Sequence, residues 1–381
     1  MNPAPFALER WFARHEFSAR YLLCASDCET MTIDELLAFE PQARERLLSL
    51  RLGYTESAGS PSLRRQISSL YHSIDADQVL VHNGAEEAIF LFMHAALSPG
   101  GHLVVHTPCY QSLAEVARSI GCDVSPWLAR EENGWALDPA ELARLVRKDT
   151  RAIVLNSPHN PTGWHMQAAV FRQVVQFAEE RGIVLFSDEV YRGLEYDPGD
   201  TLPAGCDSGQ HVVSLGVMSK TFGLAGLRIG WVASRDRGLL ARMAALKDYT
   251  TICASAPGEF LAELALRHAE EIAGRSRRIV QANLGILDGF FARRGDLFSW
   301  HRPKAGPIAF PRLLAGDASA FCDALLSGAG VLLLPGSVYE NRGNHLRVGF
   351  GRADMPRAVT AMEEFIESRP DAICGPASRR R

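Results

Sequence analysis

Apolar and polar positions follow two different periods along the middle of the chain, from about residue 60 to residue 235. Short apolar runs that end in glycine, proline or polar residues predict buried strands. Between these runs, apolar residues recur at the spacing of a helix that buries one face. The predicted strands are Val79–Val81, Leu103–His106, Ala152–Leu155, Ile183–Phe186 and Val212–Leu215. The predicted helices are Ser62–His72, Glu86–Leu97, Gln111–Ile120, Pro139–Val146 and Ala168–Arg181.

Strands that alternate with helices in this way predict an α/β fold with a mostly parallel, doubly wound sheet. In such a sheet the ligand lies at the carboxyl ends of the strands. We assign residues 49–284 to a large domain that contains the sheet. Residues 1–48 and 285–381 are expected to form a smaller α+β domain that closes over the site. The tail, about 376–381, is expected to be disordered.

Composition narrows the class of protein. The 381 residues are 47% hydrophobic and 22% charged, close to the average of globular proteins. A net charge of −4 provides no basic field for nucleic acid as a partner. No apolar run reaches the about 18 residues that span a membrane, and Met1–Phe6 lacks a signal-peptide pattern. Eight scattered cysteines predict reduced thiols, no metal site and a cytoplasmic protein.

Lys220 is the most informative position, because it lies just before a Gly-rich turn and Arg228 follows eight residues later. A lysine amine held among apolar neighbours favours the neutral, nucleophilic form that Schiff-base chemistry requires. Arg228 could hold a phosphate of the same ligand through a bidentate contact. The alternative is an ordinary surface lysine on a loop.

Two loops that follow predicted strands carry further polar groups. The first is Asn156–Gly163, a proline-rich and rigid turn that contains Asn160. The second is Ser187-Asp188-Glu189-Val190-Tyr191, where an apolar run ends in two carboxylates. Groups at the carboxyl end of a parallel strand face a ligand crevice, so Asp188 could contact a positively charged group of a ligand. An ordinary loop and an acidic helix cap are the alternatives.

Three other positions could bind an anionic group or an aromatic ring of a ligand. The strand at Val79–Val81 runs into Gly84, and the helix that follows would aim its first backbone N–H groups at an anion such as a phosphate. Tyr110 follows another predicted strand and could equally pack in the core. Arg347 lies in an apolar, strand-like segment, where burial without an anionic partner would be costly. A structural salt bridge is its alternative role.

In this order and spacing, the motifs resemble the pyridoxal 5'-phosphate (PLP) enzymes of fold type I, in particular the class I and II aminotransferases. Asn-Pro-Thr-Gly followed by Ser-Asp-Glu-x-x-Tyr is the strongest part of the signature, and the resemblance extends from about Gly53 to about Gly351. It implies that PLP is the cofactor. The implied catalytic residues are Lys220 as the Schiff-base lysine, Asp188 at the pyridine nitrogen and Tyr191 at the phenolic oxygen.

The resemblance also implies how the rest of the cofactor and the substrate are held. Asn160 would bond the phenolic oxygen, Tyr110 would stack on the pyridine ring, and Arg347 together with Asn160 would bind the substrate's α-carboxylate. Tyr54 would cross the interface of a homodimer to the neighbouring subunit's phosphate, although it could be a solvated loop group. The implied phosphate-binding positions are Gly84, Ala85, Glu86, Ser219 and Arg228.

The chain departs from the family pattern in two places. Many relatives carry a serine three residues before the lysine, and here that position is Val217. The segment Leu22–Glu29 lacks the Gly-rich stretch that usually contacts the substrate. Substrate preference is therefore the least transferable part of the resemblance, and no second arginine for a dicarboxylate is identified.

Three functions are compatible with these features. The resemblance favours an aminotransferase that moves the amino group of an L-amino acid to a 2-oxo acid. The second is another PLP outcome, a lyase or an elimination or cyclisation enzyme of amino-acid secondary metabolism. The third, a PLP-binding regulator, would need an added DNA-binding domain, and the family core begins too early in the chain to leave room for one.

Overall fold

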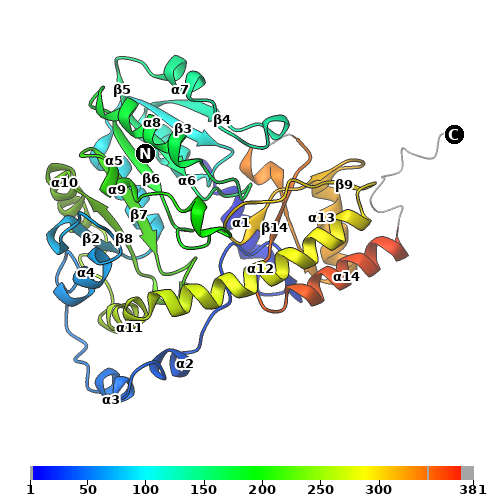
Figure 1. Cartoon of the computed structure of the whole chain (residues 1–381), viewed down its shortest axis with the longest axis horizontal. Coiled ribbons are helices and arrows are strands. Elements are labelled where there is room, and N and C mark those ends of the chain that lie inside the picture. Colours follow the sequence, from blue (N-terminus) through cyan, green and yellow to red (C-terminus); the bar gives the residue numbers. More distant parts are fainter. Residues whose placement is uncertain (1–2, 341–342, 370–381) are drawn as a thin grey trace.

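A seven-stranded sheet forms the centre of the computed structural model, which describes residues 3–340 and 343–369 (Figure 1). Its strands are β2 (Val79–His82), β3 (His102–Thr107), β4 (Asp123–Leu128), β5 (Thr150–Asn156), β6 (Val184–Asp188), β7 (Val212–Val217) and β8 (Gly230–Ser234). Their order is β2-β8-β7-β6-β5-β3-β4, in which β8 is antiparallel to both neighbours and the remaining pairs are parallel. The predicted α/β fold with a mostly parallel sheet is confirmed.

Helices cover both faces of this sheet because successive strand side chains point to opposite faces. In β3, Leu103 and Val105 join one apolar cluster and Val104 joins another. The helices of the first cluster that cover the sheet are α5 (Ala85–Ala96), α6 (Ser112–Ile120) and α10 (Arg237–Lys247). The helices on the opposite side are α4 (Pro61–Ser68), α7 (Pro139–Leu145), α8 (Ala168–Glu179), α9 (Gly205–Ser208) and α11 (Ala256–Arg267).

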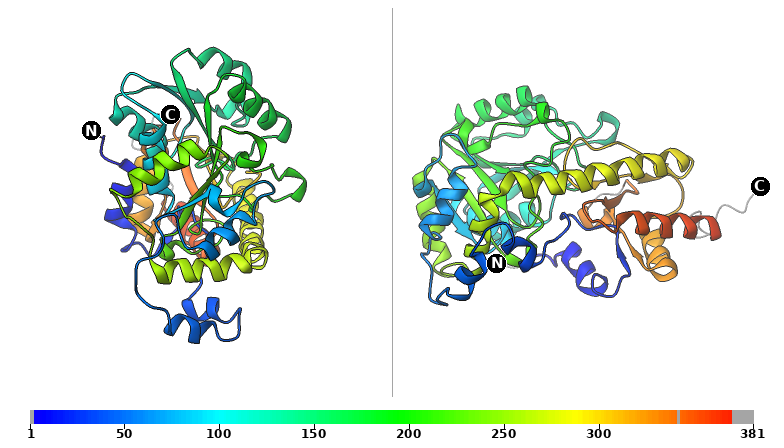
Figure 2. Two further views of the ribbon diagram at one scale, coloured as in Figure 1. Left: turned by 90° about the vertical axis from the view of Figure 1, so that its left-hand side faces the viewer. Right: turned by 60° about the horizontal axis from the view of Figure 1, so that its bottom comes forward.

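A smaller part of the chain packs beside the sheet and combines both ends of the sequence. The long helix α12 (Ala269–Arg293) runs from the sheet part towards it, as Figure 1 and the right-hand view of Figure 2 show. The helices of this smaller part are α1 (Ala7–His15), α13 (Ala318–Ala329) and α14 (Met355–Ser368). Its short strands are β1 (Tyr21–Leu22), β9 (Phe298–Ser299), β10 (Ile308–Ala309), β11 (Arg312–Leu313), β12 (Val331–Leu332), β13 (Leu334–Pro335) and β14 (Leu346–Gly349).

The pairing of β1 with β12 ties the N-terminal segment to the C-terminal one, with Tyr21 opposite Val331. The helices α2 (Ile33–Leu37) and α3 (Ala43–Leu48) lie elsewhere, because their apolar residues pack in the cluster that contains α4 and α11. The first 48 residues therefore contact both parts of the molecule. The division into 49–284 and 1–48 plus 285–381 stays a prediction, and the expected disorder of 376–381 lies outside the described residues.

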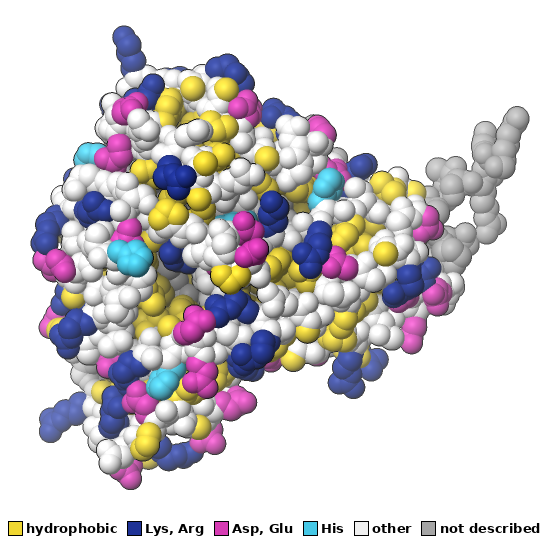
Figure 3. Space-filling view, viewed as in Figure 1, with side chains coloured by type: hydrophobic (Ala, Val, Ile, Leu, Met, Phe, Trp, Pro, Cys, Tyr) yellow, Lys and Arg dark blue, Asp and Glu magenta, His cyan; other side chains and the backbone are white. Residues whose placement is uncertain are grey.

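The described residues also determine whether a membrane-spanning helix or a group of metal ligands is present. Among them, no helix is long and apolar enough to cross a membrane, and no group of three or more possible metal ligands comes together. Their seven cysteines are free thiols. On the face shown in Figure 3, acidic and basic side chains are interspersed.

Candidate active site

A cavity of about 430 Å³ lies where β5, β6 and β7 end, at the carboxyl edge of the parallel strands. Its wall includes ten of the predicted site residues, brought together from positions 85 to 347. Gly84 and Tyr54 are not in the wall. The ten residues are Ala85, Glu86, Tyr110, Asn160, Asp188, Tyr191, Ser219, Lys220, Arg228 and Arg347.

Lys220 enters this cavity from the loop after β7, and its side chain is half-buried. Its Nζ donates a hydrogen bond to Oγ of Ser26 at 2.9 Å. Burial lowers the pKa of the Lys220 amine, and the nearby charge of Asp27 opposes that shift. A lower pKa increases the fraction of neutral, nucleophilic amine at neutral pH.

Asp188 is the last residue of β6, and its side chain faces the same cavity. One carboxylate oxygen accepts a hydrogen bond from the backbone N–H of Val190 at 3.2 Å. Burial raises the pKa of Asp188 to about 7, although the Val190 N–H and the charge of Lys220 favour the charged form. A cation beside this carboxylate would stabilise it, so the position fits a protonated ring nitrogen.

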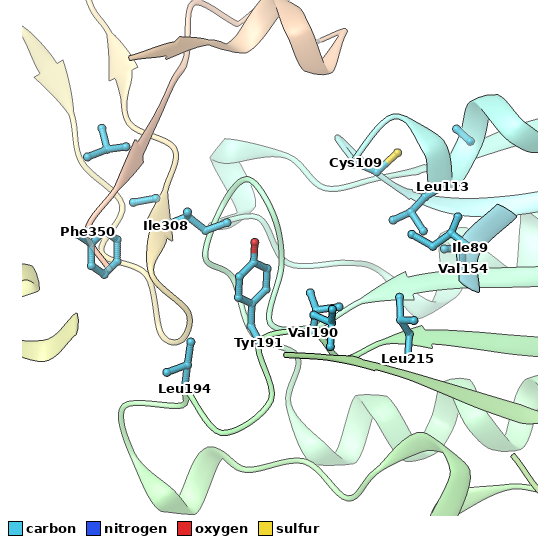
Figure 4. Packing of buried hydrophobic residues seen from close by; sticks show 14 of the residues in the cluster. Ile89, Cys109, Leu113, Val154, Val190, Tyr191, Leu194, Leu215, Ile308 and Phe350 are labelled. Carbon is cyan, nitrogen blue, oxygen red and sulfur yellow. The ribbon is translucent and has the colours of Figure 1, made fainter. Parts of the chain in front are cut away.

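Tyr191 is 1% exposed, and its ring lies between Ile308 and Val190 (Figure 4). Burial raises the pKa of its hydroxyl well above the ordinary range, so the hydroxyl remains protonated and able to donate. Asp188 lines the cavity from the last position of β6, and Tyr191 lines it from the segment that follows.

Arg347 lies on β14 and is 1% exposed. Its guanidinium donates to the Cys24 carbonyl at 3.1 and 2.7 Å, to Oη of Tyr339, and to Oδ1 of Asn160 at 3.4 Å. Tyr339 also donates to Asn160 Oδ1, at 3.0 Å. Within the described ranges no carboxylate pairs with Arg347, so a structural salt bridge does not account for its burial. A buried guanidinium of this kind favours an anionic ligand.

Helix α5 begins beside Arg228, and this arrangement also favours an anion. Gly84 precedes the helix with a φ of +86°, and a Cβ there would lie 2.5 Å from Nη2 of Arg228. The helix N-terminus carries partial positive charge, and the guanidinium adds a full one. Arg228 has no carboxylate partner in the described part of the chain. A phosphate between the N-terminus of α5 and the Arg228 guanidinium would accept hydrogen bonds from both. Ala85, Glu86 and Ser219 also line the cavity.

Tyr110 lines the cavity, and its hydroxyl donates to Oε1 of Glu9 at 2.8 Å. The ring of Phe6 lies 5.0 Å from the Tyr110 ring at an angle of 52°. The N-terminal segment thus fixes the orientation of Tyr110 through one polar and one aromatic contact.

Helix α1 supplies part of the cavity wall that sequence patterns did not reveal. Leu8, Glu9 and Phe12 of the helix and Glu16 just after it line the cavity. The spacing of 9, 12 and 16 places them on one helical face, and this is the only signal that could have drawn attention to them. The Phe12 ring lies 5.7 Å from the Arg347 guanidinium carbon.

Ser26 and Asp27 join the wall from the segment that lacks the family's Gly-rich stretch. Asp27 forms a bidentate ion pair with Arg352, at 3.1 and 2.7 Å. Val217, in place of the usual serine, also lines the cavity.

Tyr54 is 91% exposed and lies outside this cavity. Other exposed apolar side chains lie near it in sequence, among them Leu48 at 79% and Leu52 at 84%. Single exposed apolar residues are common, but several within one short stretch of chain, here the end of α3 and the loop after it, are typical of an interface with another chain.

The chain belongs to the class I and II aminotransferase family, whose model matches residues 21–363. PLP is therefore its cofactor. The buried carboxylate at Asp188 and the anion-binding arrangement at Arg228 fit this group independently of the comparison.

Individual relatives differ in the reaction that their names describe. Capreomycidine synthase from Streptomyces vinaceus is 30% identical and aligns with 94% of this chain and 93% of its own length. Arginine–pyruvate transaminase from Pseudomonas aeruginosa is 28% identical over 81% of this chain and 80% of its own.

Two solved structures are similar over nearly the whole chain. A PLP-dependent aminotransferase from Streptococcus suis has a TM-score of 0.91 and 32% identity, covering 97% of this chain and 99% of that one. The PLP-dependent cyclase OrfR has a TM-score of 0.89 and 32% identity, covering 97% and 98%. The family and cofactor are thus established, whereas relatives with different reactions share the same fold.

Proposed function

We propose that this protein is an aminotransferase that moves the amino group of an L-amino acid to a 2-oxo acid. The observation that carries the proposal is the buried Arg347, which has no carboxylate partner among the described residues and faces the cavity that also contains Lys220 and Asp188. Both an amino acid and a 2-oxo acid carry the carboxylate that such a guanidinium would bind. One site can therefore serve both halves of the reaction.

The proposed chemistry assigns a separate task to each residue. PLP, when bound, supplies an electron sink that stabilises negative charge at the substrate's Cα. The Lys220 amine would hold the cofactor and, once free, would take the Cα proton, for which its lowered pKa suits it. Asp188 keeps its negative charge next to the ring nitrogen, and Tyr191 donates to the phenolic oxygen.

Other residues bind and orient the reactants. Arg347 and Asn160 hold the α-carboxylate, and their mutual hydrogen bond fixes the position of both. Helix α1 covers the cavity through Leu8 and Phe12, which reduces the access of water to the reacting atoms. The backbone at Gly84, Ala85 and Glu86, with Ser219 and Arg228, binds the phosphate.

We further propose that the active unit is a homodimer. The high exposure of Tyr54 supports this, because the side chain reaches away from the cavity of its own chain. In an isologous dimer each Tyr54 would contact the phosphate of the neighbouring subunit.

Elimination or cyclisation is the second candidate reaction. Two relatives, named as a synthase and as a cyclase, align with more than nine-tenths of the chain. The cavity also contains carboxyl groups that could protonate a leaving group: burial raises the pKa of Glu86 to about 7 and also raises the pKa of Glu16.

Product analysis distinguishes the two reactions. The PLP-loaded protein is mixed with single amino acids, beginning with arginine, first without and then with pyruvate. Transamination should convert the cofactor to pyridoxamine phosphate in the first mixture, and pyruvate should restore it with release of alanine. Turnover of the amino acid without pyruvate, with loss of water or ammonia and no pyridoxamine phosphate, would overturn the proposal in favour of elimination or cyclisation.

A further inference from the structure

The cavity wall contains more acidic groups than the cofactor and the proposed reaction require. Three basic side chains line it, Lys220, Arg228 and Arg347. Each has a proposed role: Lys220 binds the cofactor, Arg228 its phosphate, and Arg347 the substrate's carboxylate. The acidic residues in the wall are Glu9, Glu16, Asp27, Glu86 and Asp188.

Three of these acids have a partner or role of their own. Asp188 faces the ring nitrogen in the proposed site, and Arg352 neutralises Asp27 through two hydrogen bonds. Glu86 accepts a hydrogen bond from Ser112 at 3.0 Å, and its pKa is raised to about 7 by burial. Glu9 accepts a hydrogen bond from Tyr110 at 2.8 Å, and neither Glu9 nor Glu16 has a cationic partner among the residues that the structure describes.

Glu9 and Glu16 lie on the same face of the N-terminal helical segment, with Phe12 between them. Burial and the charges of Asp27 and Glu9 raise the pKa of the Glu16 carboxyl, so a cation placed between these groups would stabilise its charged form. Each side chain is half-buried, which reduces screening of such a cation by water.

The cavity binds a ligand on grounds that do not involve these acids. Arg347 lines the cavity, is buried and has no carboxylate partner among the described residues, so in the proposed function it would fix the position of the substrate's α-carboxylate. The Phe12 ring lies 5.7 Å from the Arg347 guanidinium and belongs to the helix that carries Glu9. A substrate held by Arg347 would therefore lie beside the helical segment that carries both acids.

We propose that Glu9 and Glu16 select amino acids whose side chain ends in a cation, an ammonium or a guanidinium group. This inference rests on the proposed function, because it assumes that the amino acid binds with its carboxylate at Arg347. It adds the substrate class. The acidic wall would also repel dicarboxylic amino acids, which find no further unpaired arginine among the residues that line the cavity.

The test compares ligands of nearly equal shape and different charge. Arginine and citrulline differ in a guanidinium and a neutral urea group, and their analogues without the α-amino group cannot react with PLP. Binding of these unreactive analogues to the PLP-loaded protein is measured by calorimetry. The arginine analogue should bind at least about tenfold more tightly than the citrulline analogue. An ion pair in a partly buried site strengthens binding of the charged ligand over the neutral one to this extent.

Two substitutions then assign the preference to named residues. Glu16→Gln and Glu9→Gln keep the size of the side chain, and the amide oxygen at position 9 can still accept from Tyr110. Each substitution should lower the affinity for the arginine analogue by about threefold to tenfold and leave the affinity for the citrulline analogue unchanged. Glu45→Gln, on the exposed side of α3, is the matched control and should change neither.

Equal affinity for the two analogues in the wild-type protein would overturn the inference, and so would a preference that survives the double substitution. Unfolding temperatures of the variants show whether the fold is intact. Because binding is measured without turnover, a failure of transamination with every amino acid would contradict the proposed function while leaving the charge preference measurable.

Discussion

Lys220 and Ser26 are separated by 194 positions in the sequence, yet Nζ of the lysine donates to Oγ of the serine at 2.9 Å. The hydrogen bond joins the loop after the central strand β7 to the segment that follows α1. The proposed catalytic amine is therefore in direct contact with the part of the chain that differs from the family pattern.

Lys220 should be the residue that carries the cofactor. Borohydride reduction of the yellow protein is expected to fix PLP on the peptide that contains Lys220, because reduction makes the Schiff base permanent. Lys220→Ala should keep the fold and lose turnover by about three powers of ten or more. Lys247, which is fully buried, serves as the control site, and cofactor fixed there would show the assignment to be wrong.

Asp188 should favour catalysis at the expense of stability. A carboxyl whose pKa rises from 3.8 to about 7 on folding binds more protons when folded, so its folded form is progressively destabilised as the pH rises through that interval. In cofactor-free protein, Asp188→Asn should therefore raise the unfolding temperature above pH 7 and change it little near pH 4.

The same variant should bind PLP and lose Cα deprotonation by about three powers of ten, because a neutral ring accepts charge poorly. Deprotonation is measured by exchange of the Cα hydrogen for deuterium. A near-normal exchange rate would mean that Asp188 does not act on the ring nitrogen.

Arg347→Lys preserves the charge and removes the planar fork of donors. We expect KM for amino acids to rise about 10- to 100-fold, with the absorption spectrum of the free protein unchanged. If simple amines without a carboxylate react with the wild-type protein as well as amino acids do, the role of Arg347 is wrong.

Gly84→Ala should interfere with phosphate binding, because the new Cβ would lie 2.5 Å from Nη2 of Arg228. The expected result is a loss of PLP affinity of about tenfold or more, as the guanidinium is displaced. Gly100 is a matched control, since it has a φ of +79° and nothing within 4 Å of its Cβ position. Gly100→Ala should cost stability through backbone strain and leave PLP affinity unchanged.

Tyr54→Phe should weaken PLP binding by about tenfold if the hydroxyl contacts the phosphate of the partner subunit. Because Val217 stands where relatives have a serine, adding Val217→Ser should restore part of that affinity. Tyr249→Phe, at an equally exposed tyrosine, should have no effect on PLP. An active monomer, found by sedimentation under assay conditions, would contradict the dimer proposal.

The sequence predicted the centre of the fold well because its strands are short and apolar and end at clear loop signals. Val212–Leu215 is expected as a strand and is found within β7. The strand β4 is not among the predicted strands, because Pro126 interrupts its apolar pattern. The sheet tolerates this proline because β4 lies at its edge.

Within the site, motifs identified Lys220, Asp188 and Arg347, and the structure places all three in one cavity. The contacts of Glu9 with Tyr110 and of Tyr339 with Asn160 could not be predicted, because each joins residues more than 100 positions apart. The pKa of Asp188 likewise depends on its burial, which the sequence does not state.

Helix α1 has a consequence for how this scaffold can change its chemistry over time. The residues proposed to read the substrate side chain lie on one short helical segment, whereas the loops after β6 and β7 and the start of α5 are proposed to hold the cofactor. Substitutions on that segment that keep the hydrogen bond of Glu9 with Tyr110 can alter selectivity without disturbing the groups proposed to bind PLP. Exchange of residues 7–16 between relatives is therefore a compact route to new specificities, in the laboratory as in evolution.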